Sequence, residues 1–288
     1  MPISAVESNL AKPVLATEKA DYVEIGGDQV YYVHHRARNA MAQMLLPGHF
    51  VTERPFAYAL WVRWARYLAE RGISALRFDY RGCGESTGEF RRFSLSSWLE
   101  DCRVLNGFLE AQAEGVPMLL GGIGLGGLLA SRLFQEGLGA GMLLWSPSAS
   151  GAGALRDTLL RRLAFDMTNS PTGRSKSWSD YESSLQHGES IEAAGYILTP
   201  TLWQEAAGMK LMLPEGGRDS GVDSRGRAWK ITKLGQAQVP LVPGGGLWQA
   251  LNPGLRMRLA PLNPDLREFF EDNVQWIHSK LNNLIRKS

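Results

Sequence analysis

Residues 118–135 read MLLGGIGLGGLLASRLFQ, an apolar segment that glycines divide into two parts. The first part, Met118 to Gly121, is the short continuous apolar run of a buried strand. The second part, Leu125 to Gln135, predicts a helix, and the glycines between the two parts predict a sharp turn. A buried strand that enters a helix through such a turn is typical of an α/β domain.

The chain on either side of this turn repeats the order of strand and helix. Short alternating stretches predict a hairpin of Tyr22 to Ile25 with Val30 to His34. Further buried strands are predicted at Met41 to Leu46, Ser74 to Phe78 and Gly141 to Trp145. Helices are predicted between them, one with Phe56, Leu60, Trp64 and Leu68 on its apolar face and one from a Ser97–Glu100 capping box to Ala113. Crossovers of this length favour a mostly parallel sheet.

The regular alternation stops after Trp145. Residues 146–208 are therefore predicted to be an inserted helical cap, with one helix at Ala154 to Phe165. Beyond it we expect a strand at Met209 to Leu213, a helix at Arg225 to Lys233 and a last strand at Ala237 to Val242. The final helix follows from an apolar stripe of Leu266, Phe270, Val274, Ile277, Leu281 and Leu284. The predicted domains are a loose arm at 1–20, a core of 21–145 with 209–288, and the cap at 146–208.

The composition excludes several classes of protein. The 288 residues carry 31 basic and 29 acidic side chains, a net charge of +2, and 44% of them are hydrophobic. Disordered chains contain fewer apolar residues and nucleic-acid binding needs a basic surplus, so neither is expected. Cys83 and Cys102 are too few for a disulfide scaffold and lack the spacing of zinc ligands. With no signal-peptide pattern either, we expect a cytoplasmic protein without a transmembrane segment, a metal or a cofactor.

The turn Gly122 to Gly126 has the spacing of the nucleophile elbow G-x-S-x-G of serine hydrolases. Gly124 stands where the attacking serine belongs, so the frame is present without its nucleophile. With Gly127 the same glycines also match the dinucleotide fingerprint G-x-G-x-x-G. That interpretation predicts an acidic residue about twenty positions later, where Trp145, Ser146 and Pro147 stand instead. A third interpretation is a turn kept only for close packing.

Several segments together resemble the exosortase A system-associated hydrolases, in particular the type called hydrolase 2. They are DYRGCGES at 79–86, GIGLGGLL at 122–129, LWSP at 144–147, EAAGY at 192–196 and VPGGGLW at 242–248. The resemblance implies an α/β-hydrolase fold, with a mostly parallel sheet covered by helices on both faces and an inserted helical cap. It also implies a setting beside exopolysaccharide production and a membrane protein-sorting system. The elbow of this group often departs from serine, in agreement with Gly124.

A hydrolase triad also needs a histidine after the last strand and a carboxylate after the strand before it. Leu247 stands at the predicted histidine position. Glu215 and Asp219 follow the predicted strand at Met209 to Leu213 and are vestigial acid candidates. Without a histidine, neither acid has anything to orient.

The chain has five histidines, and sequence position argues against most of them as a catalytic base. His34 and His35 fall on an early strand, His187 in the insertion and His278 on the final helix. Cys83 and Ser86 are alternative nucleophiles, but no histidine is placed in sequence to activate them.

The predicted ligand site surrounds the elbow. The backbone N–H of Leu125 and one from the loop Pro47 to Phe50 are expected to form an oxyanion hole. The candidate residues of this hole are His49, Phe50, Gly124 and Leu125, and His49 is expected to touch a ligand. Trp145, Leu247 and Trp248 are predicted to line the pocket, with plain packing as the alternative for the tryptophans.

The size of the rate acceleration that remains without a triad separates the functional hypotheses. Without a triad, oxyanion binding and positioning leave an acceleration of only roughly 10³ to 10⁴ over water. We therefore expect a pseudoenzyme that binds a small acyl, lipid-linked or glycan-derived ligand, or a protein partner of the exosortase or exopolysaccharide system. Two alternatives stay open: an active esterase, thioesterase or acyltransferase with a non-standard nucleophile, and a scaffold with a vestigial pocket.

Overall fold

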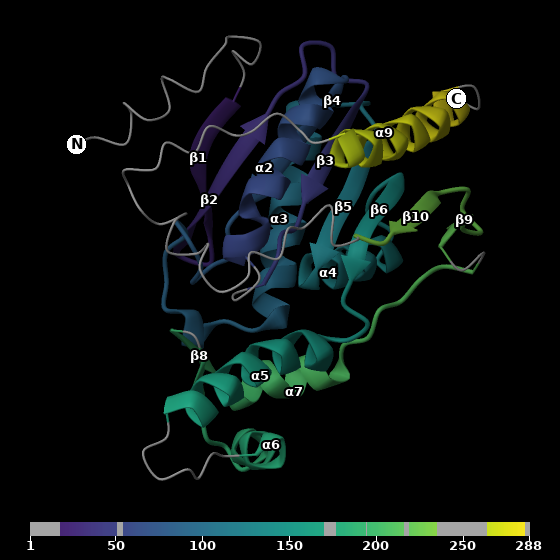
Figure 1. The fold of residues 1–288 in the computed structure, drawn as a ribbon. Coiled ribbons are helices and arrows are strands. Elements are labelled where there is room, and N and C mark those ends of the chain that lie inside the picture. The colour runs from purple at the N-terminus through teal and green to yellow at the C-terminus, as the bar shows by residue number, and fades with distance from the viewer. Residues whose placement is uncertain are drawn as a thin grey trace.

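The computed structural model describes residues 18–50, 54–169, 177–193, 195–215, 219–234 and 264–285. Its centre is an eight-stranded sheet with the strand order β1-β2-β4-β3-β5-β6-β10-β9 (Figure 1). The strands are β1 (Glu18–Ile25), β2 (Asp28–His35), β3 (Ala42–Leu46), β4 (Ile73–Phe78), β5 (Met118–Gly124), β6 (Gly141–Pro147), β9 (Ser220–Val222) and β10 (Ala228–Thr232).

The middle of the sheet is parallel and its two edges are antiparallel. β3 pairs in parallel with β4 and β5, and β6 pairs in parallel with β5 and β10. The β1–β2, β2–β4 and β9–β10 pairs are antiparallel. The prediction of a mostly parallel sheet is confirmed. The carboxyl ends of the parallel strands lie along one edge, where α/β sheets place their ligands.

Helices cover both faces of the sheet. They are α2 (Arg54–Glu70), α3 (Leu95–Gln112), α4 (Leu125–Gln135) and α9 (Pro264–Ile285). Successive residues of a strand face opposite sides, so Met44 and Leu46 pack with α2 and α9, whereas Leu45 packs with α3 and α4. Burial on both faces explains why the central strands are apolar throughout.

A second layer follows β6 at the edge where the parallel strands end (Figure 1). It contains α5 (Gly151–Asn169), α6 (Trp178–Gln186), α7 (Pro200–Gly208) and a two-stranded ribbon of β7 (Ile191–Ala193) and β8 (Tyr196–Leu198). The ribbon touches the core where the Tyr196 ring packs edge-on against Phe90, with ring centroids 4.9 Å apart. The layer therefore covers the carboxyl edge of the sheet.

The elements before residue 146 and the last helix lie where the sequence predicts them, with two corrections. β1 begins at Glu18, which pairs with His35, so the end of the predicted arm belongs to the sheet. The Ser97–Glu100 capping box is wrong, because α3 begins at Leu95 with Ser94 as its N-cap. The Ser97 hydroxyl instead accepts the Ser94 N–H at 3.4 Å, as the third helical residue of a box that starts earlier.

Two predictions between residues 209 and 233 are wrong. Met209 to Leu213 does not join the sheet, because its backbone bonds to the segment that leads into α5, with Leu211 N–H donating to the Ala149 carbonyl at 2.9 Å. Arg225 to Lys233 is not helical. The Asp223 carboxylate accepts the Arg225 and Arg227 N–H groups and fixes a turn, so the chain forms the β9–β10 hairpin. The predicted last strand, Ala237 to Val242, lies outside the described residues.

Candidate functional site

The turn between β5 and α4 has the strained backbone of a nucleophile elbow. Gly124 is the N-cap of α4, with φ of 55° and ψ of −125°. A residue with a side chain adopts such sparsely populated angles at a cost of about 1–3 kcal/mol. Glycine adopts them freely, so the turn keeps its shape while the side chain that would attack a substrate is missing.

Two further glycines let the turn touch the neighbouring backbone. A Cβ on Gly126 would lie far inside contact distance of the Pro47 and Gly48 carbonyl oxygens. A Cβ on Gly122 would lie 2.6 Å from the Gly126 carbonyl oxygen. The N-terminus of α4 therefore packs directly against the loop that follows β3.

This contact brings together the two parts of the predicted oxyanion hole. The first turn of a helix leaves its N–H groups without intrahelical partners and carries the positive end of the helix dipole. Leu125 is the first residue of α4 and is fully buried. The oxyanion hole itself stays a prediction, for which the adjacency of α4 and the loop after β3 is the supporting geometry.

A cleft opens beside this loop, at the carboxyl ends of β3 and β4. It is a small cleft with a cavity volume of about 30 Å³, and its walls come from the loop after β3, from α2, from the end of β4 and from β8. The polar and ionisable side chains on the wall include His49, Arg54, Arg77, Asp79 and Cys83. The cleft thus combines charged groups of the core with Tyr196 of β8, which belongs to the outer layer.

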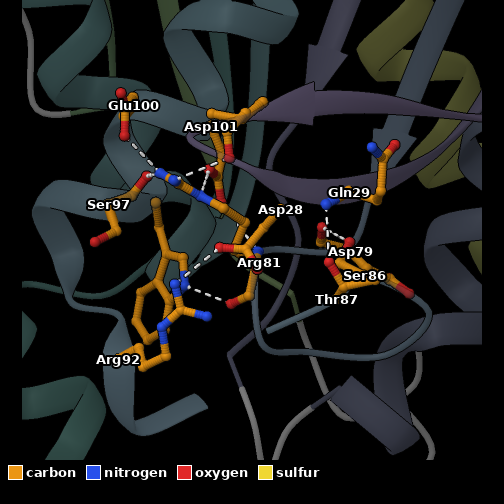
Figure 2. Close-up of polar contacts among 12 residues, drawn as sticks. Asp28, Gln29, Asp79, Arg81, Ser86, Thr87, Arg92, Ser97, Glu100 and Asp101 are labelled. Carbon is orange, nitrogen blue, oxygen red and sulfur yellow. Dashed lines mark hydrogen bonds and ion pairs between the residues drawn. The ribbon is translucent and has the colours of Figure 1, made fainter. Parts of the chain in front are cut away.

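Asp79 anchors the loop that follows β4 (Figure 2). Its buried carboxylate accepts Arg54 Nη2 at 2.5 Å and the Glu85 N–H at 3.0 Å. The Ser86 hydroxyl donates to the Asp79 carbonyl oxygen at 2.6 Å and accepts the Tyr31 N–H at 2.8 Å. Ser86 is therefore a structural hydroxyl, and the Asp79–Arg54 pair forms one side of the cleft.

Arg81 ties the same loop to α3 (Figure 2). Its guanidinium donates to Asp101 at 2.5 Å, to Glu100 at 2.6 Å and to the Ser97 carbonyl at 2.9 Å. Burial raises the pKa of Asp101 to about 6, and the bonds from Arg81 oppose that rise. Because this network is internally paired, we assign it a structural role.

All five histidines of the chain lie within the described residues. His34 and His35 are buried on β2, far along the chain from the elbow. His187 ends α6 and lies 2.7 Å from the Ser183 carbonyl oxygen, and His278 on α9 lies 3.1 Å from the Arg71 carbonyl oxygen. His49 is the one imidazole on the cleft wall.

The other predicted pocket residues are dispersed. Phe50 is 2% exposed and packs on Trp98, with ring centroids 5.2 Å apart, as a core side chain. Trp145 is 1% exposed and lies on the face covered by α2 and α9, not on the cleft wall; its ring neighbours are Trp61, Trp64, Phe269 and Phe270. Leu247 and Trp248 lie outside the described residues.

The acid candidates do not follow a strand of the sheet, because the predicted strand at Met209 to Leu213 does not form. Both precede β9, and both are exposed. The Asp219 carbonyl accepts the Ile231 N–H at 2.7 Å, which places Asp219 beside the end of β10. An acid role for Glu215 or Asp219 stays a prediction.

Cys83 is the thiol on the cleft wall. It is 6% exposed, and burial raises its pKa to about 12. The charges that act on this pKa are Arg54, which lowers it, and Asp79 and Asp101, which raise it. A thiol with this pKa is protonated at neutral pH, and only the thiolate is a strong nucleophile.

We expect neither cysteine to react rapidly with a thiol reagent in the folded protein. Cys83 and Cys102 are both buried, and burial raises the pKa of each thiol. Titration with dithionitrobenzoate near neutral pH should find no fast thiol in the native protein and both thiols after unfolding in urea. One fast equivalent that maps to Cys83 in the native protein contradicts the assignment.

Three cleft residues were not predicted from the sequence: Arg54, Arg77 and Tyr196. One signal was available, since Arg77 interrupts the apolar strand ISALRF and a charge in a buried strand needs partners. Tyr196 comes from a short ribbon that no periodicity predicts. No spacing rule connects these three positions, because the fold alone brings them together.

The strand order, with an elbow between β5 and α4, defines the α/β-hydrolase fold. The model of the family described as Serine aminopeptidase, S33, matches residues 58–186, which include the elbow, α5 and α6. Together the topology and this match support an α/β-hydrolase superfamily member. The fold class predicted from the sequence is thereby confirmed.

Solved structures resemble the chain at low identity. Est1E from Butyrivibrio proteoclasticus, solved with ferulic acid, is 18% identical with a TM-score of 0.48, over 75% of this chain and 89% of that one. An α/β serine hydrolase homologue from Coxiella burnetii is 17% identical with a TM-score of 0.42, over 51% and 71%. Alpha/beta hydrolase domain-containing protein 10 from mouse is 17% identical with a TM-score of 0.43, over 68% and 75%. No curated protein matches the chain.

The described ranges of the chain hold neither a membrane-spanning helix nor a metal-binding cluster. None of the helices in those ranges is both long and apolar enough to cross a bilayer. The same ranges hold no group of three or more His, Cys, Asp or Glu side chains that could bind a metal ion.

Proposed function

We propose that this protein is a pseudoenzyme of the α/β-hydrolase type, which binds a ligand or partner and does not hydrolyse through a Ser-His-Asp triad. The observation that carries the proposal is Gly124, which has the strained backbone of the elbow and no side chain. Leu247 at the predicted histidine position supports it from the sequence. The remaining acceleration of roughly 10³ to 10⁴ is small for a dedicated hydrolase.

The cleft between the sheet and the outer layer is the proposed ligand site. Tyr196 of β8 contributes to its wall, which fits the proposal that residues 146–208 act as a cap. By resemblance, the ligand is a small acyl, lipid-linked or glycan-derived molecule, or the partner is a protein of an exosortase or exopolysaccharide system in the cytoplasm. An intact fold with a cleft and no nucleophile at the elbow supports binding over turnover.

The test is hydrolysis and binding measured on the same purified protein. With p-nitrophenyl esters of short acids, we expect product to form at the rate of the buffer blank. A panel of acyl and sugar compounds should contain members that raise the melting temperature, because a ligand that binds the folded state stabilises it. Sustained ester turnover, abolished by Gly124→Val, would contradict the proposal.

The second candidate is an esterase, thioesterase or acyltransferase with a non-standard nucleophile. One observation favours it, since the Cys83 thiol and the His49 imidazole line the same cleft. The raised pKa of Cys83 opposes it. Turnover of a thioester that disappears in both Cys83→Ala and His49→Gln would establish this activity.

Restoring the elbow serine should not restore hydrolysis. We expect Gly124→Ser to lower the free energy of unfolding by about 1–3 kcal/mol, because serine must adopt the backbone angles that glycine adopts freely. Urea unfolding measures that loss, and an ester assay on the variant should stay at the blank. Turnover in Gly124→Ser that is lost on adding His49→Gln would instead show that His49 acts as a base.

A further inference from the structure

The cleft carries more positive than negative charge. Among the described residues, its charged wall groups are Arg54, Arg77 and Asp79. Asp79 is already satisfied, because its two oxygens accept Arg54 and the Glu85 N–H. The wall therefore carries two guanidinium groups and one carboxylate, and a bound anion would neutralise the second positive charge.

The two guanidinium groups share one aromatic ring. The Cζ atoms of Arg54 and Arg77 lie 5.4 and 5.2 Å from the centroid of the Tyr58 ring. Each guanidinium has five N–H donors, and the described bonds use only some of them. Arg77 donates one hydrogen bond to the Tyr58 hydroxyl at 2.8 Å and one to His35. Arg54 donates one to Asp79. Both guanidinium groups therefore keep N–H donors for the oxygens of a carboxylate or a phosphate.

A relay through the buried His35 fixes the position of Arg77. Arg77 Nε donates to Nε2 of His35 at 3.1 Å, so the proton of the neutral ring is on Nδ1, which lies 3.1 Å from Glu18. Burial lowers the pKa of His35, which favours this neutral ring. Glu18 in turn accepts Arg66 Nε at 2.6 Å. An arginine held by such a chain is pre-organised for its ligand.

Aromatic rings form much of the remaining wall. Trp61, Tyr80 and Tyr196 line the cleft together with Tyr58. The Tyr80 hydroxyl donates to the Gly48 carbonyl at 3.1 Å, which holds that ring in place. Rings around the two guanidinium groups keep water away from them, and a lower local dielectric strengthens their attraction for an anion.

We propose that the cleft binds the acid group of a small anionic ligand, a carboxylate or a phosphate, on Arg77 and Arg54. This inference rests on the proposed binding function and narrows the ligand classes given there to their acidic members. The relay of Glu18 and His35 makes Arg77 the main contact, because Arg54 is shared with Asp79.

The test is isothermal titration of the full chain with matched probes. Glucuronate and glucose 1-phosphate carry the two acid groups, methyl glucoside is the neutral ring, and ethyl hexanoate is a neutral acyl probe. At least one acid should bind at least ten-fold more tightly than methyl glucoside. Tighter binding of glucuronate would indicate carboxylate recognition, and tighter binding of glucose 1-phosphate would indicate phosphate recognition. The affinity of the acid should fall as salt is added.

Variants locate the acid group. Arg77→Gln should weaken binding of the acid at least ten-fold, whereas Arg91→Gln, at an exposed surface pair with Glu89, should leave it unchanged. If Arg77→Gln does not fold, Tyr58→Phe removes the hydroxyl that bonds Arg77 and should weaken binding about three-fold, on the scale of one modest hydrogen bond. Neutral probes that bind as tightly as the acids, or an unchanged affinity in the Arg77 and Tyr58 variants, would overturn the inference and leave the proposed function standing. Absence of binding by every probe would overturn the inference as well, whereas the proposed function is contradicted only by the ester turnover described above.

Discussion

Replacing Gly126 with alanine is expected to lower the free energy of unfolding by on the order of 3 kcal/mol, and to do so without touching any ligand group. The added Cβ would meet the carbonyl oxygens of Pro47 and Gly48, which belong to the backbone and cannot rotate away. Relief requires that α4 and the loop after β3 move apart. Because that loop also forms one wall of the cleft, ligand binding should weaken in the same variant.

A matched glycine in the neighbouring helix provides the control. Gly107 lies inside α3, and a Cβ built there meets no atom within 4 Å. Gly107→Ala should therefore raise the free energy of unfolding by about 0.5–1 kcal/mol, the usual gain of alanine over glycine within a helix. Urea unfolding of both variants measures the contrast. Equal stability changes in the two variants would mean that the elbow does not pack against the loop as described.

Acid should destabilise the protein through His34. Burial, followed by the charges of Arg36 and His35, lowers the pKa of His34 from 6.5 to about 4. Between these values the unfolded chain binds a proton that the folded chain does not, so the free energy of unfolding falls as the pH falls. At about 1.4 kcal/mol for each pKa unit, the loss is on the order of 3 kcal/mol. Above pH 6.5 the ring is neutral in both states and this contribution is constant.

Other groups titrate in the same window, so the measurement is a difference between variants. Burial raises the pKa of Asp101 from 3.8 to about 6, so Asp101 contributes in the opposite direction as the pH falls. His34→Gln removes only the imidazole, and its free energy of unfolding should depend less steeply on pH than that of the parent. The exposed His187→Gln should keep the parent slope. If His34→Gln keeps it as well, His34 is not held neutral in the fold.

The sequence predicted the elements whose signal is local. Apolar runs such as Met41 to Leu46 mark strands buried on both faces, and the glycines from 121 to 127 mark a turn that must touch other backbone. The hairpin of β9 and β10 was missed because its short strands show no clear period, and its turn depends on one side chain, Asp223. Met209 to Leu213 has a strand pattern but bonds to the segment before α5 instead.

The sequence predicted residues of the site only where they belong to the elbow motif or to the loop beside it. Gly124 followed from the elbow spacing, and His49 from its place in the loop beside the elbow. The Arg77 guanidinium gains its role from His35 and Glu18, which lie in other strands and bond to it only after the sheet forms. Trp145 resembled a pocket residue by position, yet it points to the face of the sheet covered by α2 and α9.

We propose that the elbow holds no nucleophile and that no other side chain replaces it. Incubation of the native protein with a fluorophosphonate, followed by intact mass measurement and peptide mapping, tests this most directly. We expect an unchanged mass under conditions that fully label an active serine hydrolase. A stoichiometric adduct on one residue would contradict it and would identify the nucleophile.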